Sequence, residues 1–262
     1  TAGFMGKAMS WRAAAALGGY GSIWLVMTVF KLDYVWMYSL IGALGLLMVI
    51  TLYCYFPRFD TGEVQHKKII LRKRYWLYYA LTFMSGARRQ IFTVFAGFLM
   101  VEKFGYSAAD ITLLFLINYL FNFLFAKRIG KFIGVVGERK ALMFEYIGLI
   151  GVFVGYGLVQ SAEWAAALYV IDHLFFALAL AIKTYFQKIA DPADMASTAG
   201  VSFTINHIAA VVIPVTFGVI WLSSPATVFY IGAAMAAVSL LLSLNIPKTP
   251  QEGNEVRVFS WR

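Results

Sequence analysis

The stretch YWLYYALTFMSGARRQIFTVFAGFLMV, residues 75–101, places two adjacent arginines in the middle of an apolar run long enough to cross a bilayer. A charge at the centre of a spanning helix costs about 2.5–3.5 kcal/mol on insertion scales, and a guanidinium stays protonated in proteins. Arg88 and Arg89 must therefore face a water-filled cavity, a counter-ion or an anionic ligand. This stretch indicates both a membrane fold and a first candidate site.

The remaining sequence has the composition of a polytopic membrane protein. It is 61% hydrophobic and 13% charged, with a mean hydropathy of +0.74, whereas soluble proteins carry about 25% charged residues. A net charge of +9 is compatible with nucleic-acid binding. The Lys and Arg residues are not gathered into one patch, however, so we expect no nucleic-acid partner. We predict an all-α transmembrane helix bundle in a lipid bilayer, with eight spans at about 13–30, 34–56, 75–101, 109–126, 141–160, 163–182, 199–222 and 225–246.

The basic residues indicate an orientation. If the loop 57–74 is cytoplasmic, the cytoplasmic side receives nearly all remaining Lys and Arg, including Arg12 and Lys183, and the other side receives only Lys31 and Lys103. This asymmetry is the positive-inside rule. It predicts a cytoplasmic C-terminus, and we expect an integral protein of a bacterial inner membrane.

The most charged break in the chain, PRFDTGEVQHKKIILRKR at 57–74, predicts the domain organisation. We interpret it as a cytoplasmic linker between two bundles; the alternative is an ordinary basic loop. Residues 1–56 would then be the last two helices of an N-terminal bundle, 75–247 a six-helix bundle, and 248–262 a cytoplasmic tail. Because the chain opens with Thr1, we expect further N-terminal helices upstream.

A second basic segment, AKRIGKFIGVVGERKAL at 126–142, resembles the loop signature Gly-x-x-x-Asp-Arg-x-Gly-x-Arg-Lys of the major facilitator superfamily. Gly130 and Gly137 keep the spacing of its glycines, and Arg139 and Lys140 keep its basic end. Gly134 and Val135 replace the Asp and Arg. The resemblance implies a twelve-helix transporter of which this chain holds helices 5 to 12. It also implies that the spans at 75–101, 109–126, 163–182 and 199–222 line a central cavity.

The deep polar residues fall on those same four spans. As substrate-binding candidates we take the polar groups of three of them: Arg88, Arg89, Gln90, Asn118, Asn122, Asn206 and His207. Asp172 and His173 are candidates for proton coupling or for a counter-ion. Structural roles are the alternative, with Asp172 pairing one arginine and the amides forming interhelical hydrogen bonds. Glu145 is expected near the cytoplasmic end of its span, paired to a loop or snorkelling.

These patterns predict a secondary active transporter that moves a small anionic or zwitterionic solute by alternating access. Protons or another ion are the candidates for the coupling species. Two deep arginines against one aspartate favour a negative group on the solute. No HExxH, GxSxG, phosphate-binding loop or Cys/His cluster occurs, so we expect no enzyme, catalytic residue, cofactor or metal site. The alternatives are a membrane enzyme with an intramembrane Asp/His site, and a non-transporting scaffold or sensor.

Overall fold

A computed structural model describes residues 2–25, 29, 34–57 and 69–258. These residues are largely helical and contain no strand, which confirms the predicted all-α class for this part of the chain. The elements are α1 (Ala2–Leu25), α2 (Tyr34–Tyr55), η2 (Lys73–Tyr75), α3 (Trp76–Gln90), the π-helix η3 (Ile91–Ala96), α4 (Gly97–Phe104), α5 (Ala108–Val136), α6 (Glu138–Leu158), α7 (Ala162–Phe176), η4 (Ala177–Ala179), α8 (Leu180–Ile189), η5 (Pro192–Asp194), α9 (Met195–Ser223) and α10 (Pro225–Ser243).

Six helical segments of the described chain are long and apolar enough to cross a membrane, as expected for an integral membrane protein. They are Tyr38–Tyr55, Asp110–Val136, Glu138–Leu158, Ala162–Ile189, Pro192–Ser223 and Pro225–Ser243. The other two predicted spans, 13–30 and 75–101, correspond to α1 and to the run from α3 to α4, with 26–28 and 30 outside the described residues. Both are helical but carry charges within their length, which lowers their mean hydropathy.

The predicted loop 126–142 is wrong, because α5 continues to Val136 and α6 starts at Glu138. Only Gly137 separates them, with φ at +84°, a backbone conformation that glycine adopts without steric cost. The end of α5 is amphipathic: Ala126 and Ile133 are buried while Lys127, Arg128 and Lys131 are exposed. The bases that suggested a loop therefore form the exposed face of a helix.

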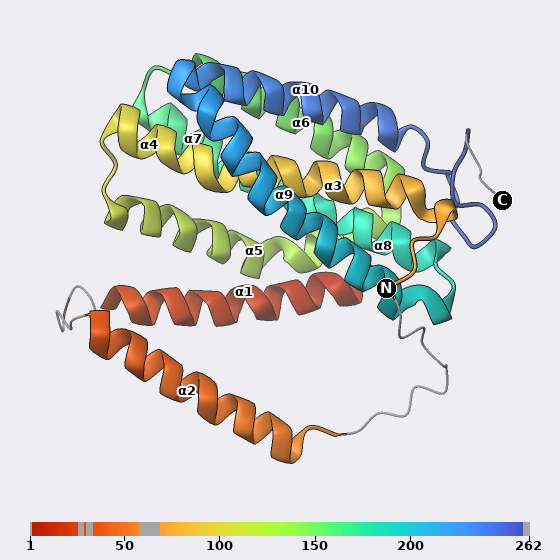
Figure 1. Ribbon diagram of the computed structural model, residues 1–262, viewed down its shortest axis with the longest axis horizontal. Coiled ribbons are helices and arrows are strands. Elements are labelled where there is room, and N and C mark those ends of the chain that lie inside the picture. Colours follow the sequence, from red (N-terminus) through yellow and green to blue (C-terminus); the bar gives the residue numbers. More distant parts are fainter. Residues whose placement is uncertain (1, 26–28, 30–33, 58–68, 259–262) are drawn as a thin grey trace.

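The helices from α3 to α10 form one bundle, in which α6 lies along α10 and α3 crosses α9 (Figure 1). Its interior holds two apolar clusters. One is centred on Phe95, Phe153 and Phe229, and the other on Leu77, Tyr146 and Tyr185. Helix α2 stands apart from the bundle, and the apolar window Tyr38–Tyr55 has no buried residue (Figure 1).

Helix α1 lies against α5 through small residues. A Cβ added to Gly6 would lie 2.5 Å from the carbonyl oxygen of Ala126, and one added to Gly130 would lie 2.4 Å from that of Ala2. Such close backbone approach is typical of membrane helices that pack through small residues. Further along, the Tyr20 ring stacks on Tyr119 with centroids 5.2 Å apart. These contacts fix α1 along α5 at both ends.

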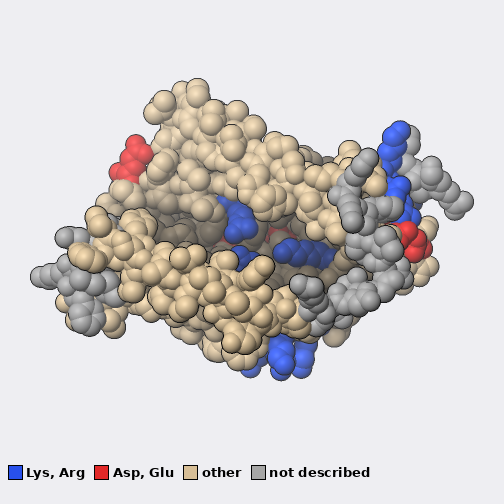
Figure 2. All heavy atoms as spheres, turned by 60° about the horizontal axis from the view of Figure 1, so that its bottom comes forward, with Lys and Arg blue, Asp and Glu red and all other residues tan. Residues whose placement is uncertain are grey.

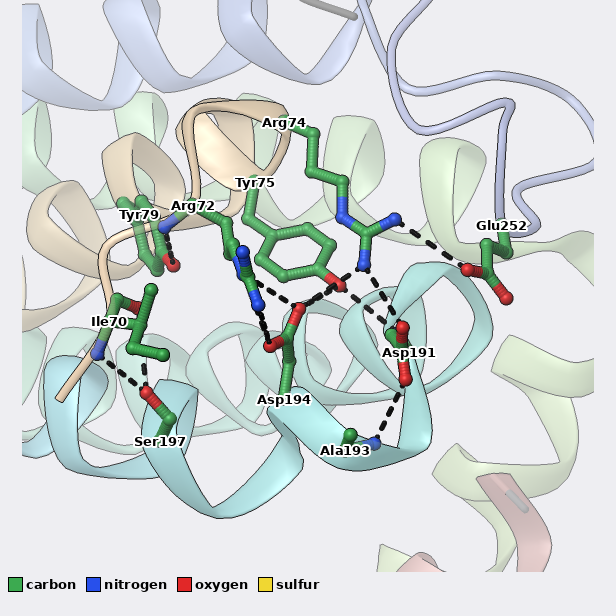
Figure 3. Close-up of polar contacts among 10 residues, drawn as sticks. All are labelled: Ile70, Arg72, Arg74, Tyr75, Tyr79, Asp191, Ala193, Asp194, Ser197 and Glu252. Atoms are coloured by element: carbon green, nitrogen blue, oxygen red, sulfur yellow. Dashed lines mark hydrogen bonds and ion pairs between the residues drawn. The ribbon is translucent and has the colours of Figure 1, made fainter. Parts of the chain in front are cut away.

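An ion-pair cluster around Asp194 fastens the chain before α3 to the turn before α9 (Figure 3). The buried Asp194 carboxylate lies 3.1 Å from Nη2 of Arg72 and 3.1 Å from Nη2 of Arg74, and it accepts a hydrogen bond from Tyr75 Oη. Nearby, Ile70 donates its backbone N–H to Ser197 Oγ. The segment 69–75 is therefore held at one end of the bundle.

Candidate functional site

Arg88 points into the bundle. Its side chain is fully buried, with Nη2 3.7 Å from Glu145 Oε1 on α6. Nη1 donates to Ser239 Oγ on α10, and the guanidinium carbon lies 4.5 Å from the centre of the Tyr146 ring. A cation over an aromatic face is attracted by the ring quadrupole. Arg88 thus joins α3 to α6 and α10, neither of which is among the four spans expected to line the cavity.

Two carboxyl groups interact electrostatically with the Arg88 guanidinium. Asp172 on α7 is buried and lies within electrostatic range of both Arg88 and Glu145. The expectation that Glu145 snorkels or pairs with a loop was wrong, because its side chain is fully buried beside Arg88. Hydropathy alone conceals such a residue, since a single carboxylate in an apolar helix has little effect on the average. The ion pair offsets the desolvation of both groups.

The polar centre around Arg88 is only partly satisfied by hydrogen bonds. Within the described residues, Arg88 Nε and Nη2 and both Glu145 carboxylate oxygens have no hydrogen-bond partner. An unsatisfied buried polar group costs about 1–3 kcal/mol. We call Arg88, Glu145 and Asp172 the buried charge centre.

Arg89 faces the other way. Successive residues of an α-helix point about 100° apart, and the Arg89 side chain is exposed while Arg88 is buried. Arg12 on α1 and Lys183 on α8 are also exposed. Helix α8 packs against both α1 and α3, so the positive charges of Arg12 and Arg89 act on Lys183. We call Arg12, Arg89 and Lys183 the basic cluster.

Among the described residues, the basic cluster has no carboxylate partner within ion-pair distance. Figure 2 shows one face of the molecule hollowed, with Lys and Arg side chains (blue) and a smaller area of Asp or Glu (red) inside the hollow. Sequence patterning had assigned Arg12 and Lys183 to the cytoplasmic side together with the loops. It did not indicate that helices far apart in sequence bring them near Arg89.

Amides and an imidazole lie beside this cluster. The side-chain amide nitrogen of Asn122 lies 2.6 Å from His173 Nε2, which links α5 to α7, and the Arg89 charge reaches His173. Asn118, one turn before Asn122, is buried, and neither its oxygen nor its nitrogen has a partner within the described chain. Buried polar groups of this kind are normally satisfied by water or a ligand.

Aromatic rings flank the amides on α5. Besides stacking on Tyr119, the Tyr20 ring lies 6.3 Å from Phe115. The charges of Arg12 and Arg89 both reach Tyr119. This aromatic group therefore adjoins the basic cluster at the contact between α1 and α5.

Two of the helical segments that carry deep charges, α3 and α7, are followed directly by a break in regular α-geometry. The π-helix η3 begins two residues after Arg89, and η4 separates Asp172 and His173 from Lys183. Single π-segments in α-helices occur frequently at functional sites, and transporters bind substrates at interrupted helices. The backbone irregularity thus coincides with the polar side chains.

The other predicted site residues lie elsewhere or lack polar partners. The Asn206 side-chain amide donates a hydrogen bond to the Ser202 carbonyl oxygen within α9. Its Oδ1 packs against Gly86 of α3, so closely that a Cβ added to Gly86 would lie 2.6 Å from it. His207 is exposed, and its contacts in the described structure, with Phe203, stay within α9. Gln90 is half-buried. Of the loop motif, Gly130 packs on α1 and Gly137 forms the turn, while Arg139 and Lys140 lie in the first turn of α6.

Comparison with protein-family models and with curated proteins gives no match for this sequence. In the described residues, no group of three or more His, Cys, Asp or Glu side chains could hold a metal ion. The arrangement presents a compensated charge buried between α3, α6, α7 and α10, and an uncompensated basic cluster from α1, α3 and α8. Its chemistry suits the reversible binding of an anion.

Proposed function

We propose that this protein is a secondary active transporter that carries a small anionic solute across the membrane by alternating access. The observation that supports it most strongly is the basic cluster. Arg12, Arg89 and Lys183 come from three helices of a membrane bundle and have no carboxylate partner in the described chain. Like charges held together repel, so the cluster favours an incoming anion.

The proposal follows the resemblance to the major facilitator superfamily, with eight spans matching helices 5 to 12 and a cytoplasmic C-terminus in a bacterial inner membrane. In this scheme Arg89, with Asn122 and His173 beside it, contacts the solute, and Arg88 acts as a structural group. The buried charge centre is the candidate site for coupling to protons, because intramembrane Asp and Glu residues serve as relays in transporters.

The test is anion flux through proteoliposomes that contain the full-length protein. We expect at least one small anion to produce transport above that of empty liposomes. Arg89→Gln should abolish this flux, whereas Lys248→Gln should retain it, because Lys248 is an exposed base after the last helix. Absence of flux for a broad panel of anions, or equal flux in Arg89→Gln, would contradict the proposal.

A further inference from the structure

The end of helix α5 borders a cavity that the proposed transport mechanism does not use. The cavity has a volume of about 450 Å³ and is lined by the beginning of α1, the end of α5, the beginning of α6 and the end of α8. Volumes of this size are usual for small-ligand sites. Gly3 and Gly134 both line it, and a Cβ added to either would meet nothing within 4 Å. The cavity is therefore open along the backbone of α1 and α5.

Two lysines from different helices line this cavity. Lys131 of α5 is exposed and forms no ion pair within the described residues. Lys188 of α8 is half-buried, and its Nζ lies 2.7 Å from Oε1 of the buried Glu138 on α6. Because an ammonium has three N–H donors, Lys188 can bind an anion while it keeps its contact with Glu138. With two lysines and one carboxylate, the cavity favours an anionic ligand.

The length of α5 places the cavity at the level of the lipid headgroups. At a rise of 1.5 Å per residue, its 29 residues extend over about 43 Å, which exceeds the hydrocarbon core of about 30 Å. Lys127, Arg128 and Lys131 are exposed on its last turns. Exposed bases are costly in hydrocarbon but stable among polar headgroups. The end of α5 therefore belongs in the headgroup region.

An apolar side chain lines the cavity beside the lysines. Val135 of α5 is 86% exposed and is part of the cavity wall. Free phosphate has no apolar part that could cover it, whereas a phospholipid carries glycerol and acyl chains directly beside its phosphate. The combination of lysines and an exposed valine thus favours a lipid over a water-soluble anion.

We propose that this cavity binds the headgroup of an anionic phospholipid, with the lipid phosphate between Lys131 and Lys188 and the glycerol against Val135. Basic pockets between membrane helices are known to bind acidic lipid headgroups. The bound lipid would connect α5 to α8. This site is separate from the basic cluster, and the proposal does not depend on the transport of a solute.

Native mass spectrometry of the full-length protein, released from detergent with one added lipid, measures this binding. The probes are phosphatidylglycerol and phosphatidylcholine with the same acyl chains, and we expect phosphatidylglycerol to bind more tightly. Lys131→Gln should weaken the binding of phosphatidylglycerol about fivefold, as expected for the loss of one base beside an acidic headgroup. Lys140→Gln is the matched control and should bind like wild type, because Lys140 is an exposed base of the first turn of α6 that does not line the cavity.

Two further variants distinguish the cavity from general surface charge. Gly134→Leu fills the cavity without changing any charge and should also weaken the binding of phosphatidylglycerol. Glu138→Gln removes the carboxylate beside Lys188 and should strengthen this binding, a gain that a loss of folding cannot produce.

Wild-type binding of phosphatidylglycerol in Lys131→Gln or in Gly134→Leu would overturn the proposal. An equal loss in Lys131→Gln and Lys140→Gln would also overturn it, because that result would indicate diffuse attraction to the basic surface. Displacement of the lipid by an equal concentration of inorganic phosphate would indicate a site for free phosphate and would overturn the assignment to a lipid.

Discussion

At the scale of single residues, two neighbouring arginines have opposite environments. Arg88 is buried against Glu145, Ser239 and Tyr146, whereas Arg89 is exposed beside Lys183. The sequence showed that an arginine pair in a span must be compensated. It could not show which arginine is compensated, because that depends on how α3 is rotated against α6 and α10.

The buried charge centre predicts a non-additive pair of substitutions. Glu145→Gln and Asp172→Asn each leave one carboxyl near Arg88, so each alone should reduce stability modestly. The double variant leaves a buried guanidinium without a counter-ion, which costs on the order of 3–5 kcal/mol. Thermal or denaturant unfolding of the four proteins in detergent measures the coupling. Losses that simply add would mean that the two carboxyls do not share Arg88.

At the scale of helices, the sequence did not predict the breaks in α-geometry at η3 and η4. The stretches 75–101 and 163–182 were predicted as single spans, yet one contains η3 and the other η4. Neither interruption contains Pro or Gly, the residues that usually indicate a kink or break in a helix. The interruptions arise from tertiary packing, which local propensity does not encode. The helical class itself was predictable, because apolar length alone indicates it.

The contact between α1 and α5 predicts a matched pair of glycine substitutions. Gly130→Ala would place a Cβ 2.4 Å from the Ala2 carbonyl oxygen, so α1 must shift, at a cost of about 1–3 kcal/mol. Because α1 carries Arg12, anion affinity should fall as well. Gly134→Ala meets nothing within 4 Å and should be neutral, or stabilising by up to about 1 kcal/mol. Unfolding and anion titration of both variants measure these effects; equal behaviour would refute this packing.

At the scale of the whole molecule, the Asp194 cluster joins segments that are distant in sequence. Asp194→Asn weakens charge-assisted bonds to Arg72 and Arg74 and should cost on the order of 2 kcal/mol of stability. Asp191 is the matched control, because its carboxylate is more exposed and lies 3.6 Å from Arg74. Asp191→Asn should cost about 0–1 kcal/mol. Thermal unfolding compares them, and an equal loss would show that the burial of Asp194 has no consequence.

The candidate site was predictable in part. Deep polar residues on apolar spans pointed to Arg89, Asn122 and His173, which the structure brings together. Arg12 and Lys183 were not predicted as site residues, because basic residues near the ends of spans usually indicate membrane orientation. Glu145 escaped for a similar reason, and Asn206 and His207 were included although they bond mainly within α9. Spacing along the chain does not reveal which helix faces converge.

The division of roles between Arg88 and Arg89 is tested most directly by titrating Arg88→Lys and Arg89→Lys with the anion that the protein transports. Stability and affinity are read from the same unfolding curves. Lysine keeps the charge but lacks the planar fork. We predict that Arg88→Lys lowers the melting temperature and keeps the affinity, whereas Arg89→Lys keeps the melting temperature and loses affinity at least tenfold. Wild-type affinity in Arg89→Lys, or a loss of affinity confined to Arg88→Lys, would contradict the account.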